Sequence, residues 1–119
     1  MSLLSELAAT PGVVAAGQYT WRGDRFTFEG QLDPEQARMA SIMCRATTMV
    51  THMQARMLEA IHPGSGLDPP TGWFVRGQAF SVCVVSNVFC FVDNAQASPG
   101  AVLALMGERL GEDRLEAII

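Results

Sequence analysis

Two cysteines in the last third of the chain are spaced so that they could react with each other. Cys83 and Cys90 lie in one apolar run, on either side of Ser86-Asn87. If Ser86-Asn87 form a two-residue turn, Cys83 falls opposite Cys90 with Cα atoms about 5.5 Å apart, which is within disulfide reach. Serine is a poor residue for a turn that needs positive φ, so this register stays open. The two cysteines are either a redox-responsive thiol pair or two small buried apolar side chains, and we favour the second interpretation.

The other residues that could do chemistry are too far apart to act together. His52 and His62 are separated by about 15 Å along a helix, and Cys44 and His52 by about 12 Å. All eight basic residues are arginines, which excludes a phosphate-binding lysine and a Schiff base. No common metal, nucleophile or dinucleotide motif is present. We therefore predict no catalytic residue, no metal ligand, no cofactor, and a protein that is not an enzyme.

Composition limits the partners that the chain can have. A net charge of −4, a pI near 5.0 and arginines dispersed along the sequence argue against nucleic acid. No apolar run reaches the length of a membrane span, and no basic residue precedes Arg22 to begin a secretory signal. Three cysteines without a framework spacing fit reduced thiols. We expect a cytoplasmic protein that binds neither nucleic acid nor a membrane.

Capping and turn residues divide the chain into three helices and five strands. The clearest signal is Asp33 as an N-cap, with Pro34 at the first helical position and Gln36 completing a capping box. No glycine or proline follows until Pro63, which predicts a helix over 34–61. The other predicted elements are helices at 3–9 and from Pro99 to about Leu110, stopped by Gly111, and strands at 13–20, 25–29, 73–77, 79–85 and 88–93.

The last two predicted strands determine the expected fold class. They are apolar on both sides, so the sheet needs cover on both faces. Three helices are available to provide that cover. The sequence therefore predicts one α+β domain over residues 1–119, in which a five-stranded antiparallel sheet lies between helices in the order α-β-β-α-β-β-β-α.

The long helix at 34–61 has two uncharged faces when its residues are placed at 100° intervals. One face carries the large apolar residues Met39, Ile42, Met43, Ala46, Met49, Val50, Met53, Met57 and Ile61. We interpret this face as the one packed on the sheet. The alternative is an adaptable methionine-rich surface for variable partners, since thioether side chains repack easily.

The second face of this helix is made of smaller residues. They are Ala37, Ala40, Cys44, Thr47, Thr48, Thr51, Ala55 and Leu58. Small residues permit close approach of two backbones, and one sheet cannot cover both faces of a helix. A second copy of the helix across a two-fold axis would cover the other face. We therefore predict a homodimer that forms through these small residues.

The chain resembles the Roadblock/dynein-light-chain family, including a poorly characterised bacterial branch of it. The resemblance rests on LxxLxxxPGVVAAG at Leu4–Gly17, on Met43-Cys44-Arg45-Ala46, and on the closing segments Gly72-Trp73 and SVCVVSNVFCFVDN. It implies a profilin-like α/β/α fold. It also implies dimers in which the long helices pack together and the third strands pair, so that Trp73 and Val75 join the interface.

This resemblance further implies a scaffold, or a regulator of small Ras-like GTPases. From the sequence we expect a non-catalytic, homodimeric protein-binding module whose partner is another protein. The alternative is a small-ligand or thiol-redox accessory protein that uses Cys83 and Cys90.

Overall fold

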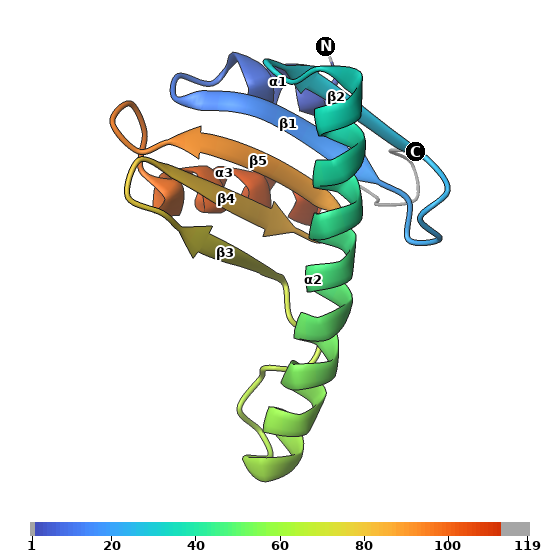
Figure 1. Cartoon of the computed structure of the whole chain (residues 1–119). Helices are drawn as coiled ribbons and strands as arrows, with labels where there is room; N and C mark the ends of the chain where they lie inside the picture. Colours follow the sequence, from blue (N-terminus) through green and yellow to red (C-terminus); the bar gives the residue numbers. More distant parts are fainter. Residues whose placement is uncertain (1, 113–119) are drawn as a thin grey trace.

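The computed structural model describes residues 2–112, which form three layers with a sheet in the middle (Figure 1). The elements are α1 (Leu3–Ala9), β1 (Val13–Tyr19), β2 (Phe26–Gly30), α2 (Pro34–Ile61), β3 (Gly72–Arg76), β4 (Phe80–Val85), β5 (Val88–Asp93) and α3 (Pro99–Glu112). The antiparallel sheet has the order β2-β1-β5-β4-β3. Helices α1 and α3 cover one face, and α2 crosses the other. The predicted fold class and element order are confirmed.

The turn between β4 and β5 has the register that the cysteine spacing suggested. Ser86 adopts a φ of 57°, and Cys83 pairs with Cys90. The buried side chain of Asn87 donates a hydrogen bond to the carbonyl oxygen of Tyr19 at 2.8 Å. The Ser86 amide donates to the carbonyl oxygen of Thr71 at 3.1 Å. These tertiary contacts stabilise a turn that serine alone does not favour.

The core under α1 and α3 is built from side chains of moderate size. Leu4 and Leu7 of α1 and Val102 and Met106 of α3 pack on one face of the sheet. On that face β4 and β5 present Cys83, Val85, Val88, Cys90 and Val92, as the alternation of their residues predicted. Helix α3 continues through Gly111 to Glu112, so the predicted stop at Gly111 is wrong. From the sequence, the stretch from Glu112 to Ile119 could either continue as a helix or fray; Glu112 is helical, and residues 113–119 lie outside the described residues.

In the core between α2 and the sheet, the large side chains come from the sheet and the small ones from the helix. The rings of Tyr19 and Phe89 are fully buried there. Gly17 leaves space for the ring of Phe89, because a Cβ at position 17 would lie 2.2 Å from Cζ of that ring. The layer between sheet and helix is thus already filled by aromatic rings. Only small side chains fit on the underside of α2.

The structure reverses the two predicted faces of α2. The methionine-rich face, which we expected to pack on the sheet, is exposed to solvent. Five of the eight small residues assigned to a dimer interface are buried within one chain, namely Ala37, Ala40, Cys44, Thr48 and Ala55. These five cannot contact a second copy of the chain, so their assignment was wrong. Ala40 and Cys44 pack directly against the ring-filled core beneath the helix.

The start of α2 is as predicted. The Asp33 carboxylate accepts a hydrogen bond from the Gln36 amide at 2.8 Å, and the Gln36 side chain accepts one from the Asp33 amide at 3.1 Å. This is a complete capping box with Pro34 at the first helical position. The helix then runs for 28 residues without interruption.

Candidate functional site

Helix α2 is much longer than the sheet it crosses is wide. Its 28 residues span about 42 Å at 1.5 Å per residue. Five strands about 4.8 Å apart place the outermost strands only about 19 Å from each other. The helix begins next to β2, passes over the strands and continues beyond β3 (Figure 1). Its C-terminal half therefore projects past the β3 edge of the sheet.

The outward side of α2 is apolar along its whole length. We call this side the α2 apolar face. It consists of Met39, Ile42, Met43, Met49, Val50, Met53, Met57 and Ile61, and we include Leu58; their exposed fractions range from 46% to 76%. Leu58 lies five turns after the buried Ala40, on the side of the helix that faces the sheet, and is exposed in the part of α2 that projects past the sheet. A continuous apolar surface of this kind is typical of a protein–protein contact. Leu58 is the only member that also belongs to the predicted dimer interface.

The neighbouring part of the sheet is also partly uncovered. Val75 of β3 and Phe80 of β4 are more than half exposed. They lie on the α2 side of the sheet, where Val75 pairs with the half-buried Val82. The outer edge of β3 pairs with no strand among the described residues. An open strand edge beside exposed apolar side chains is a template for pairing with another chain.

A hydroxyl group on the buried side of α2 ties β3 and β1 to the helix. Trp73 Nε1 donates a hydrogen bond to the Thr48 hydroxyl at 2.8 Å, and the hydroxyls of Thr48 and Tyr19 are also 2.8 Å apart. Burial raises the pKa of Tyr19 to about 12, so this phenol stays neutral. Trp73 and Thr48, both predicted as interface residues, thus hold one chain together. Of the predicted interface residues, Thr47, Leu58 and Val75 are exposed and Thr51 is partly exposed.

The loop after α2 is organised by a single carboxylate. Glu59 accepts hydrogen bonds from the amides of Gly64, Leu67 and Asp68 at 2.8 to 3.2 Å, and from the Ser65 hydroxyl at 3.0 Å. The backbone bond from Gly64 contributes most to holding the pKa of Glu59 below its usual value. The loop at 62–71 is thereby fastened to the projecting end of α2.

All three cysteines are free thiols in the interior. Cys83 and Cys90 are fully buried and Cys44 is 2% exposed. Burial raises the pKa of Cys83 to about 11 and the pKa values of Cys44 and Cys90 to about 12. Since the thiolate is the reactive form, these environments disfavour reaction at neutral pH. The redox function of the pair stays a prediction.

We expect none of the three thiols to react with a thiol reagent in the folded protein at pH 7. All three should react once the protein is unfolded, because burial is what protects them. Counting thiols with a chromogenic disulfide reagent, with and without denaturant, measures both values. Loss of two thiols after treatment of the folded protein with mild oxidant would instead support a redox function for Cys83 and Cys90.

Within residues 2–112, no group of three or more His, Cys, Asp or Glu side chains is placed to hold a metal ion. In the same part of the chain, no helix is long and apolar enough to cross a membrane.

Comparison with solved structures agrees with this architecture. The crystal structure of a Roadblock/LC7 domain from Streptomyces avermitilis matches with a TM-score of 0.63, covers 92% of each chain and is 14% identical in sequence. The chain therefore has the Roadblock fold, as the sequence resemblance implied. Residues 3–108 match the family model described as "Uncharacterized conserved protein (DUF2173)", and the chain belongs to this family. No curated protein matches the sequence.

Proposed function

We propose that the chain is a non-catalytic protein-binding module that works as a homodimer in the cytoplasm. The observation that carries this proposal is the projecting apolar half of α2 beside the open edge of β3. The Roadblock fold, which a solved domain of that name shares, supports a role in protein interaction.

The length of α2 supports pairing of two sheets at β3. If the β3 strands of two chains pair, ten strands about 4.8 Å apart span about 43 Å. That width equals the length of α2, about 42 Å. The projecting half of each helix would then lie over the partner's sheet. The half-exposed Val75 and Phe80 of that sheet would lie beneath it.

A two-fold axis fits this arrangement because the interface is self-complementary. Each chain supplies one open antiparallel edge and one apolar helix end, and each receives the same from its partner. The exposed apolar side chains supply the driving force, at about 25 cal/mol for each Å² that is covered. The remainder of the α2 apolar face then stays available for another protein.

The partner bound by such a dimer is, in this proposal, a small Ras-like GTPase or a subunit of a larger complex, for which the dimer acts as regulator or scaffold. This step rests on the fold resemblance alone. Purification of the dimer with candidate GTPases in both nucleotide states tests it. Binding to neither state would leave the scaffold role and remove the GTPase from the proposal.

The mass in solution tests the dimer itself. Light scattering after size exclusion should give twice the chain mass of 12.8 kDa at micromolar concentration. A mass of 12.8 kDa would contradict the homodimer and leave the α2 apolar face to a different chain.

A further inference from the structure

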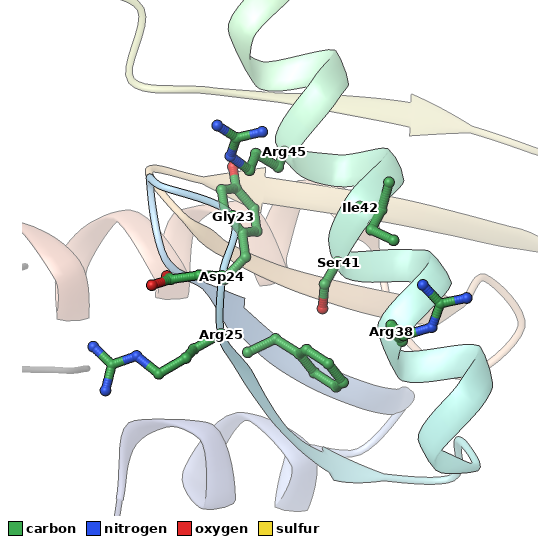
Figure 2. Close-up of a pocket in the computed structure, with 9 residues that line it drawn as sticks. Gly23, Asp24, Arg25, Arg38, Ser41, Ile42 and Arg45 are labelled. Atoms are coloured by element: carbon green, nitrogen blue, oxygen red, sulfur yellow. The ribbon is translucent and has the colours of Figure 1, made fainter.

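A small pocket lies on the opposite side of α2 from β3. It has a volume of about 240 Å³ and opens between the β1–β2 hairpin and the first half of α2 (Figure 2). The apolar or aromatic residues among those that line it are Tyr19, Phe26 and Ile42. The other lining residues are Gly23, Asp24, Arg25, Arg38, Ser41 and Arg45. All of them come from one chain, so the pocket does not depend on a dimer.

Most of the charged residues that line this pocket are arginines. Three of the eight arginines of a chain with net charge −4 line it, together with one acidic residue. In Figure 2, Arg25 and Arg38 stand on opposite sides of Ser41, and Arg45 lies at a third position above them. Arginine forks of this kind match carboxylate and phosphate groups.

Asp24, the one acidic residue that lines the pocket, interacts with other residues of the β1–β2 hairpin. The Asp24 carboxylate accepts a hydrogen bond from the Thr20 hydroxyl at 2.7 Å and lies 4.0 Å from the Arg22 guanidinium. The Thr20 hydrogen bond is the main reason why the pKa of Asp24 is lowered. The Thr20 hydrogen bond stabilises the turn, and the Asp24 carboxylate also interacts with the charges of Arg22 and Arg25. Arg38 and Arg45 are not among the charges that act on Asp24.

Arg45 is positioned before any ligand arrives. Its Nε donates a hydrogen bond to the carbonyl oxygen of Trp21 at 2.9 Å. The guanidinium packs on Gly23, where a Cβ would lie 3.0 Å from Cζ of Arg45, and Gly23 also needs a φ of +80°. The terminal nitrogens of Arg45 have no hydrogen-bond partner within residues 2–112. A fixed guanidinium with unused donors loses little entropy when it binds an anion.

Arg38 is a second cation at the pocket, and its ion pair with Glu35 is exposed to solvent. It makes a bidentate ion pair with Glu35 at 2.6 and 3.1 Å, and both side chains are more than half exposed to solvent. Exposed pairs of this type contribute little to stability. Arg38 can therefore turn toward an anion at low cost.

We propose that this pocket binds a small organic anion, a phosphate or carboxylate group attached to a flat apolar ring. The arginines that line the pocket contact the anionic group, and the ring packs on the side chains of Phe26 and Ile42, which line it as well. The volume lies below the usual range for drug-sized ligands, which restricts the ligand to about one ring.

Titration of the full chain with phenyl phosphate, followed by amide NMR shifts, tests this proposal. We expect saturable shifts at residues 19–26 and 38–45, and affinity about tenfold higher than for inorganic phosphate because the ring is partly buried. Equal affinity for the two probes, or no binding at millimolar concentration, would overturn the proposal. The oligomeric state is measured on the same samples. A failure of ligand binding can therefore be distinguished from a failure of the proposed homodimer.

Three arginine variants locate the binding. Arg45→Gln and Arg38→Gln should each weaken phenyl phosphate binding about tenfold, since each removes a charge-assisted hydrogen bond. Arg38 makes only exposed contacts, so its variant keeps the test valid if Arg45→Gln disturbs the hairpin. The matched control is Arg56→Gln, which removes an exposed charge from α2 outside the pocket. Equal weakening by all three variants would show general attraction to positive charge and overturn the proposed site.

Discussion

Replacing Leu58 with glutamate is expected to convert the dimer to a monomer. Leu58 lies in the projecting half of α2 and is 48% exposed within one chain. In the proposed dimer its side chain is covered, and a charge there loses its hydration without gaining a partner. The two-fold axis places the substitution in the interface twice. We expect dimer affinity to fall at least about 100-fold, or about 2.7 kcal/mol.

Light scattering at micromolar concentration measures this effect directly as a change from twice 12.8 kDa to 12.8 kDa. The matched control is Ala104→Glu, which adds the same charge to an exposed position on α3. It should leave the mass and the thermal stability unchanged. A dimer that survives Leu58→Glu would place the interface elsewhere than on the projecting end of α2.

Replacing Thr48 with valine is expected to destabilise the fold by about 1–3 kcal/mol. Valine has nearly the same shape but no hydroxyl, so the half-buried Trp73 Nε1 loses its acceptor and Tyr19 loses a hydrogen-bond partner. A buried polar group left without a partner costs about this much free energy. Urea unfolding with the protein concentration held constant measures the change in the free energy of unfolding.

Thr47→Val is the matched control, because the adjacent side chain is exposed. We expect a change within about 0.5 kcal/mol. The pair of variants distinguishes the two possible orientations of α2. If Thr47→Val were the costly substitution, the small-residue face would not lie on the sheet.

The order and ends of the elements could be predicted from the sequence because local chemistry determines them. Asp33, Pro34 and Gln36 define the start of α2 through contacts within four residues. Alternation of apolar residues in β4 and β5 correctly separated the two faces of those strands. The stop at Gly111 failed because glycine permits a helix end without requiring one.

The orientation of α2 could not be read from its hydropathy. Methionine and isoleucine are more apolar than alanine and threonine, which favoured the wrong face for the core. The deciding volume belongs to residues far along the chain, since the rings of Tyr19 and Phe89 occupy the space under the helix. The residues of α2 alone contain no information about how much space the side chains of the sheet leave beneath the helix.

The arginine-lined pocket could not be predicted from the sequence either. Arg25, Arg38 and Arg45 are dispersed in the sequence, and that dispersion was our argument against a nucleic-acid-binding surface. The path of the chain from the hairpin into α2 brings them to one opening. The signal that could have indicated it is Gly23 in the turn, a position where a backbone must accept close contact.

The ring-filled core beneath α2 has a consequence for how this protein can change over evolutionary time. The core of the fold contains the small residues of the helix, whereas the proposed contacts with other proteins use the large, exposed ones. Substitutions among the outer methionines can therefore alter the choice of partner while the fold is preserved. A lineage can acquire new associations along one side of a single helix without passing through unstable intermediates.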